Sequence, residues 1–126
     1  MLKKGFKELL AEANSEIETM SVVDFAYADG TSDTIVVDVR DAFERDAEGA
    51  IPGSIHASRG MLEFHADPKS PAYLSALDPS KRLVLYCGTG GRSALAAKTL
   101  LDMGFQEVAS LAGGYEAWRA AKKVQE

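Results

Sequence analysis

The stretch from residue 83 to residue 101 constrains the fold more than any other part of the chain. An apolar run at 83–85 predicts a buried strand, and residues 93–101 predict a helix by propensity and by apolar spacing. Between them lies a short loop, Cys87-Gly88-Thr89-Gly90-Gly91-Arg92. Strand, loop and helix in this order are typical of a parallel α/β sheet, which binds ligands at the carboxyl ends of its strands. The only cysteine of the chain is therefore expected at that edge.

The loop combines a thiol with groups that bind anions. Its three glycines let the backbone curl so that successive N–H groups point inward, and the start of the helix adds free N–H groups. Arg92 adds a permanent positive charge. We therefore expect the pKa of Cys87 to lie below that of a free thiol, with thiolate abundant near neutral pH. The alternative is a small buried core residue, the ordinary role of a lone cysteine, but such anion-binding surroundings seldom enclose one.

Two further motifs accompany the cysteine loop. The three motifs are Asp38-Val39-Arg40 with Glu44 and Gly49-Ala50-Ile51-Pro52-Gly53-Ser54-Ile55, then Cys87-x-x-Gly90-x-Arg92-Ser93, and finally Leu111-Ala112-Gly113-Gly114-Tyr115-Glu116-Ala117-Trp118. In this order and spacing they resemble the motifs of the rhodanese-like sulfurtransferases. The resemblance covers roughly residues 15–120. One departure is Ala50, where the family usually has histidine, and Ala50 is distant in sequence from the loop.

The resemblance implies a sulfurtransferase that works by covalent catalysis in two half-reactions. Cys87 would take the outer sulfur of thiosulfate or a similar donor as a persulfide, and cyanide or a thiol would then accept it. A partner protein is a further candidate acceptor. The resemblance implies Cys87 as the catalytic residue and assigns substrate binding to its loop, namely Gly88, Thr89, Gly90, Gly91, Arg92 and Ser93. The loop N–H groups would stabilise the anionic persulfide, and Arg92 would orient the oxygens of the donor.

Two other functions compete with this one. The first is a cysteine phosphatase or arsenate reductase built on the same kind of loop. Those families place five residues between cysteine and arginine, whereas four lie between Cys87 and Arg92. The second is a persulfide carrier or interaction module that delivers sulfur to a partner without turnover of its own. Papain-like proteolysis is a weaker option, because no Cys–His–carboxylate arrangement is apparent.

Two charged residues are candidates for the rim of the site. Glu44, on a helix predicted at 42–47 and capped by Asp41, would lie near its mouth if the family alignment holds; otherwise it is a solvated helix residue. Arg59 could reach an anionic substrate, and a plain surface charge is the equal alternative. Asp38 and Arg40 follow an apolar strand, so we expect a structural pairing with each other or with nearby loops.

Predicted strands alternate with predicted helices along the chain, which indicates a three-layer α/β domain with a mainly parallel sheet. The resemblance specifies an α/β/α rhodanese-like domain. We predict one domain over residues 1–126, with an N-terminal helix in 1–14, a core at 15–120 and a polar tail at 121–126. Asp29-Gly30 predicts a turn, and Trp118 is expected in the core. Further predicted strands span 17–20, 34–39 and 107–109.

Charge and composition narrow the range of possible binding partners and cofactors. A net charge of −5 argues against binding of nucleic acid or anionic membranes. The two histidines, His56 and His65, lack ligand spacing with Cys87, so we expect no metal and no cofactor. One cysteine fits a reducing compartment, and no stretch has signal-peptide or transmembrane length. These features predict a stand-alone cytoplasmic domain, and the resemblance implies that it acts on a small-molecule sulfur donor.

Overall fold

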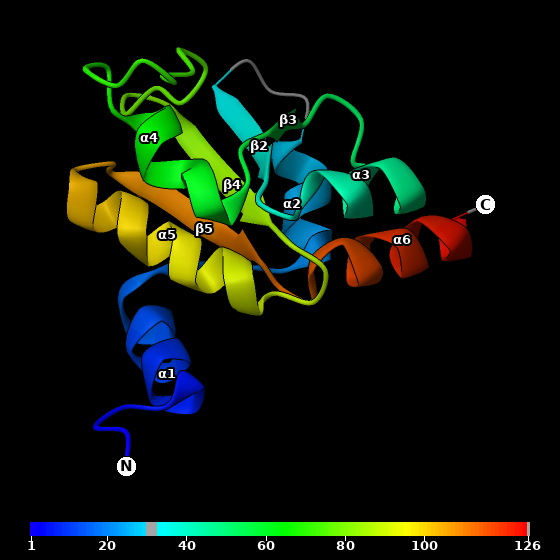
Figure 1. Cartoon of the computed structure of the whole chain (residues 1–126). Coiled ribbons are helices and arrows are strands. Elements are labelled where there is room, and N and C mark those ends of the chain that lie inside the picture. The colour runs from blue at the N-terminus through cyan, green and yellow to red at the C-terminus, as the bar shows by residue number, and fades with distance from the viewer. Residues whose placement is uncertain (30–32, 126) are drawn as a thin grey trace.

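A five-stranded sheet forms the middle of the molecule in the computed structural model, which describes residues 1–29 and 33–125 (Figure 1). The strands lie in the order β1-β5-β4-β2-β3, and each pairing between described strands is parallel. The expected α/β class with a parallel sheet is therefore confirmed. The strands are β1 (Glu18–Met20), β2 (Thr34–Asp38), β3 (Ile55–His56), β4 (Arg82–Tyr86) and β5 (Glu107–Leu111).

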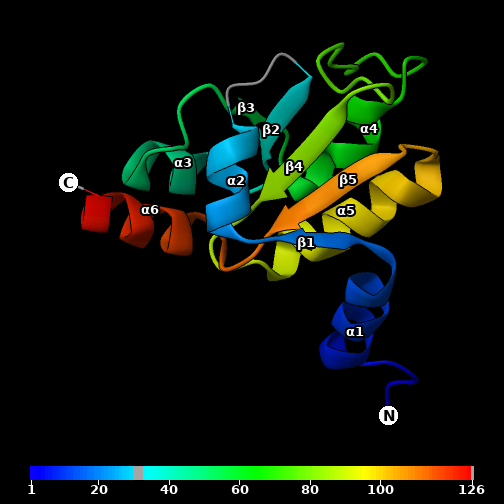
Figure 2. The same cartoon turned by 180° about the vertical axis from the view of Figure 1, so that it is seen from behind.

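Helices cover both faces of the sheet and make three layers (Figures 1 and 2). One face carries α4 (Leu62–Ala66), which follows the 3-10 turn η1 (Arg59–Met61), and α5 (Gly91–Met103). The other carries α2 (Val22–Ala28) and α6 (Gly114–Gln125), with α3 (Ala42–Glu48) beside α6. The first helix, α1 (Phe6–Glu16), projects beyond the β1 edge and lies beside the start of α5.

The alternation of side chains along β4 divides the core into two clusters. Leu83 and Leu85, with Cys87 just after the strand, face α4 and α5. Val84 and Tyr86 face the other way, toward residues of α2 and α6. Successive strand residues point to opposite faces, so the direction of Tyr86 fixes that of Cys87. The thiol therefore lies on the α5 side of the sheet.

The ends of two helices differ from the prediction. The first helix begins at Phe6 and continues past Asn14 to Glu16, where the Ser15 hydroxyl donates to the carbonyl oxygen of Glu12 at 2.7 Å. That bond satisfies a hydroxyl that would otherwise compete with the helix. The segment expected as a polar tail continues α6 through Gln125, and Glu126 lies outside the described residues.

Other predicted features agree with the structure or fall outside the described residues. Trp118 is partly buried and stacks on Tyr115 with ring centroids 5.6 Å apart. Gly30 of the predicted turn lies outside the described residues. None of the described helices has the length and apolar character required to cross a membrane.

Candidate active site

Cys87 lies directly after the central strand β4 and is almost completely buried, with 1% of its surface exposed. The chain turns at Gly90, whose φ of 112° lies in the left-handed region that favours glycine. The turn aims two backbone donors at the sulfur. The N–H of Gly90 donates to Sγ at 3.1 Å, and the N–H of Ser93, in the first turn of α5, donates at 3.4 Å.

These donors decide the acidity of the thiol. Burial is the largest single influence on Cys87 and raises its pKa. The Ser93 hydroxyl and the N–H groups of Ser93, Gly90 and Thr89 act in the opposite direction by hydrogen bonding, and together they outweigh burial. The pKa of Cys87 is therefore lowered from its ordinary value. This agrees in direction with the sequence-based expectation, although hydrogen bonds rather than charge are the main lowering influence.

The Ser93 hydroxyl connects the sulfur to a second buried serine. The Cys87 thiol donates to Ser93 Oγ at 3.5 Å, and Ser93 Oγ donates to the carbonyl oxygen of Gly90 at 3.1 Å. Ser93 Oγ also lies 2.8 Å from Oγ of Ser110 on β5. Sequence reasoning identified Ser93 but not Ser110, which comes 17 residues later in a strand predicted to end at Ala109.

The start of α6 holds the loop from outside. The N–H of Tyr115 donates to the carbonyl oxygen of Cys87 at 2.8 Å, and the N–H of Glu116 donates to that of Gly88 at 3.1 Å. Two free donors at a helix start thus bind two carbonyl groups of the loop. A Cβ at Gly114 would lie 2.6 Å from the Cys87 carbonyl oxygen, so the helix can approach this closely only with glycine there.

Arg92 pairs with Glu44 of α3. Both terminal nitrogens of its guanidinium donate to the carboxylate, at 2.7 and 2.8 Å. Glu44 is only partly exposed, at 18% of its side chain, and its second donor is the N–H of Asp41 at 2.9 Å. The side-chain hydrogen bonds from Arg92 are the main reason that the pKa of Glu44 falls to about 2. Glu44 therefore lies beside Arg92 of the loop, and its charge offsets that of Arg92.

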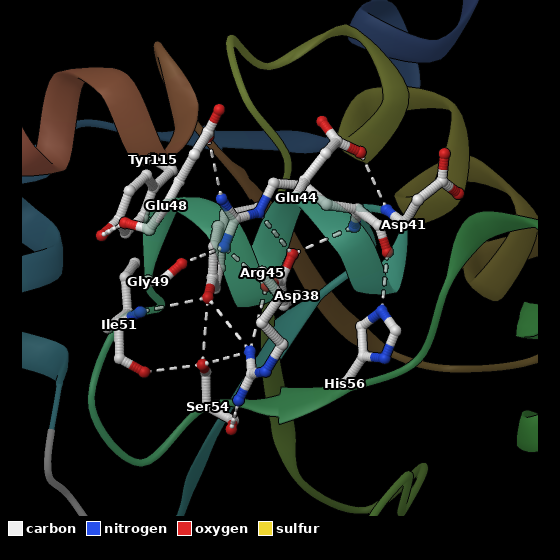
Figure 3. A network of polar contacts seen from close by, with 12 residues as sticks. Asp38, Asp41, Glu44, Arg45, Glu48, Gly49, Ile51, Ser54, His56 and Tyr115 are labelled. Carbon is white, nitrogen blue, oxygen red and sulfur yellow. Dashed lines mark hydrogen bonds and ion pairs between the residues drawn. The ribbon is translucent and has the colours of Figure 1, made fainter.

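A buried ion pair holds α3 in place (Figure 3). The side chains of Asp38 and Arg40 are completely buried and bonded at 2.8 Å, which confirms the expected structural pairing. Arg40 also donates to the carbonyl oxygen of Gly49 at 2.7 Å, and Arg45 of α3 donates to Asp38 at 3.0 Å. A buried charge requires partners of this kind. The network joins the end of β2 to the middle and to the C-terminal end of α3, the helix that carries Glu44.

Among the described residues, no hydrogen bond or ion pair connects Arg59 to the loop. Its guanidinium donates to Glu63 at 3.1 Å and to the hydroxyl of Thr99 at 3.1 Å. Thr99 lies about two turns along α5 from the loop. The structure thus joins Glu44 to the loop residues 87–93 and leaves Arg59 on the α4 side of the molecule.

A hollow of about 310 Å³ opens beside the loop, between α3 and α6. It borders the loop at Gly88, and Cys87 is not among the residues that line it. Within the described ranges, no group of three or more His, Cys, Asp or Glu side chains is placed to hold a metal ion. The residues that line the hollow are Glu44, Glu48, Gly88, Tyr115, Glu116 and Arg119.

A parallel α/β sheet with a hydrogen-bonded cysteine at the end of its central strand is the arrangement that the sequence motifs imply. The rhodanese-like domain model matches residues 21–121. The chain therefore belongs to the rhodanese-like domain family, as expected.

Relatives and solved structures agree with this assignment. The chain is 36% identical over 94 residues to a thiosulfate sulfurtransferase GlpE of Stutzerimonas stutzeri, covering 75% of this chain and 78% of the relative. It is similar to the structure of a human single-domain sulfurtransferase, with 26% identity, a TM-score of 0.67 and coverage of 81% and 95%. These relatives support sulfurtransferase activity.

A third similar protein has been described differently. A protein of unknown function from Rhodopseudomonas palustris, described as a possible tyrosine phosphatase, is 47% identical in sequence, with a TM-score of 0.91. The match covers 97% of this chain and 94% of that one. The choice between sulfur and phosphate chemistry therefore depends on the loop.

Proposed function

We propose that this protein is a sulfurtransferase that moves a sulfane sulfur from thiosulfate or a similar donor to cyanide or a thiol through a persulfide on Cys87. One observation carries the proposal: the only cysteine of a rhodanese-like chain is bonded by the N–H groups of Gly90 and Ser93. These bonds favour the thiolate, which is the nucleophilic form of cysteine.

In the first half-reaction the Cys87 thiolate attacks the outer sulfur of thiosulfate. A sulfur–sulfur bond forms at Cys87 while the bond inside the donor breaks, and its electron pair leaves on sulfite. The transferred sulfur remains as an anionic persulfide. Further N–H groups of the loop, on Gly88, Gly91 and Arg92, are the proposed donors to that outer sulfur, since backbone donors fixed before the reaction stabilise developing negative charge.

In the second half-reaction cyanide or a thiolate attacks the outer sulfur. The bond to Cys87 breaks, and its electron pair returns to Sγ as thiolate. The donors that lower the pKa of Cys87 also make it a better leaving group, because they stabilise the same negative charge. A partner protein carrying a thiol is an alternative acceptor, and the chain would then act as a persulfide carrier. The hollow that borders Gly88 is the proposed route by which an acceptor group reaches the loop.

Loop length argues against a phosphatase or an arsenate reductase. Only four residues separate Cys87 from Arg92, one fewer than in those families. A phosphate requires its phosphorus within reach of the sulfur and its remaining oxygens enclosed by loop donors. Here the guanidinium of Arg92 is also bound by Glu44 through both terminal nitrogens. A single transferred sulfur atom fits a short loop better than a caged tetrahedral anion does.

Parallel assays test the proposal. Wild-type protein and Cys87→Ser are compared, at equal concentration, for sulfur transfer from thiosulfate to cyanide and to a small thiol, and for hydrolysis of an aryl phosphate. We expect transfer by the wild type alone and no useful phosphate hydrolysis. Phosphatase turnover that disappears in Cys87→Ser, without any sulfur transfer, would contradict the proposal.

A further inference from the structure

The hydroxyl of Ser110 is buried and has one partner. Ser110 lies on β5 with 3% of its surface exposed, and its Oγ is 2.8 Å from Ser93 Oγ. Among the described residues, no other hydrogen bond of this hydroxyl is found. A buried hydroxyl hydrogen left without an acceptor costs free energy. Ser93 Oγ already donates to the carbonyl oxygen of Gly90, so the hydrogen between the two hydroxyls is assigned to Ser110.

The direction of this bond determines what Ser93 can do. A serine hydroxyl has one hydrogen and can accept two. Since Ser93 accepts from Ser110, its own hydrogen is free for the carbonyl oxygen of Gly90, at 3.1 Å, or for Sγ of Cys87, at 3.5 Å. With a neutral thiol, Ser93 accepts from the sulfur and donates to Gly90. With a thiolate, its hydrogen turns to the sulfur.

We propose that Ser110 is a positioning residue, which directs the single hydrogen of Ser93 toward the Cys87 sulfur whenever that sulfur is negatively charged. Ser110 does not touch the reacting atoms and acts through Ser93. A hydroxyl that accepts a hydrogen bond also becomes a better donor, because bonds in a chain polarise one another. The three residues thus form a short relay from β5, through the first turn of α5, to the sulfur.

The relay matters twice in the proposed reaction. It stabilises the thiolate that attacks the donor, and it stabilises Sγ again when the bond to the outer sulfur breaks and the electron pair returns to it. The role of the relay in sulfur transfer rests on the proposed function. The positioning itself can be measured without sulfur transfer, because alkylation of Cys87 by iodoacetamide follows the thiolate population. The charged groups beside the loop include Arg92 with its partner Glu44, and Glu48, Glu116 and Arg119 around the hollow at Gly88; all test variants keep them.

The experiment is a double-mutant cycle on the full chain, read as alkylation rate against pH. Below the midpoint, Ser93→Ala should lower the rate about tenfold, the scale of a lost hydrogen bond to a charged group. Ser110→Ala should lower it roughly threefold, because only the polarisation of Ser93 is lost. In the Ser93→Ala background, Ser110→Ala should have no further effect. Ser110→Thr, which keeps the hydroxyl, should restore most of the rate.

Ser54→Ala is the matched control. Ser54 is a buried serine whose hydroxyl lies 3.0 Å from that of Tyr86 and makes no described bond to Cys87. We expect its alkylation rate to equal that of the wild type. Three outcomes would each overturn the proposal. The alkylation rate could fall equally in Ser54→Ala, or stay unchanged in Ser110→Ala. Alternatively, Ser110→Ala could have its full effect in the Ser93→Ala background. If the cycle behaves as expected while wild-type sulfur transfer is absent, the relay stands and the proposed function fails.

Discussion

At the scale of single residues, Glu44 offsets the positive charge that Arg92 brings to the loop. Its carboxylate binds Arg92 through two hydrogen bonds of 2.7 and 2.8 Å. In the proposed reaction, an anionic donor would compete with Glu44 for the guanidinium. Arg92 was predicted from the sequence as the cation of the loop. Its pairing with Glu44, 48 residues away, depends on the packing of α3 against the loop, which no local pattern specifies.

Glu44→Gln should improve binding of anionic donors. The change removes the carboxylate charge and releases the guanidinium, and a partly exposed pair of this kind is worth on the order of 1 kcal/mol. The KM for thiosulfate should fall about fivefold at that energy. Glu48→Gln is the control, because it removes the same charge from the same helix, but from a residue whose partner is Arg40. An unchanged or higher KM in Glu44→Gln would show that the pair does not limit donor binding.

The same pair predicts a pH dependence of stability. The pKa of Glu44 is lowered to about 2 in the folded protein, below that of an unpaired glutamate near 4.3. The contribution of Glu44 is therefore fully present above about pH 4.3 and is lost as the pH falls toward 2. Urea unfolding between pH 2 and pH 6 should show a steeper loss of unfolding free energy on acidification in wild type than in Glu44→Gln. Equal slopes of unfolding free energy against pH in the two proteins would contradict the predicted contribution of Glu44.

At the scale of elements, apolar patterns predicted most strands and helices, and the ends of α1 and α6 were the main errors. The alternation in β4 and the glycine loop placed Cys87 correctly. Ser110 and the fit of α6 against the loop were missed for one reason: both depend on contacts between elements distant in the sequence. With the register of β5 known, Ser110 falls on the same face as Val108, toward α5.

Gly114→Ala tests whether α6 holds the loop. Its Cβ would meet the Cys87 carbonyl oxygen at 2.6 Å, so α6 must move and its two N–H bonds to the loop must weaken. We expect lower stability and slower alkylation of Cys87 below the midpoint pH. Gly53→Ala is the control: its φ of 80° carries a similar strain of about 1–2 kcal/mol, and nothing lies within 4 Å of the added Cβ. Similar alkylation rates in the two variants would exclude a role of α6 in shaping the loop.

At the scale of the whole molecule, the strand order explains why Cys87 can be buried and still have a lowered pKa. β4 lies between β5 and β2, so the loop after it is enclosed by groups from both neighbours: Ser110 from β5 and, through α3, Glu44 from the segment after β2. Ligands bind to parallel sheets at this edge of the strands. The family resemblance predicted this architecture, and the sequence patterns predicted its class. The position of Arg59 was not predicted: it lies away from the loop because η1 and α4 direct it to Thr99.

The most direct test of the central claim is the intact mass of the protein after treatment with thiosulfate in the absence of reductant. The account predicts a gain of one sulfur atom on the wild type, reversed by cyanide or by a thiol, and no gain on Cys87→Ser. Cys87 is the only cysteine, so the site of the added sulfur is unambiguous. A wild-type mass that stays unchanged with thiosulfate and with a persulfide donor, or an equal gain in Cys87→Ser, would contradict a persulfide mechanism at this residue.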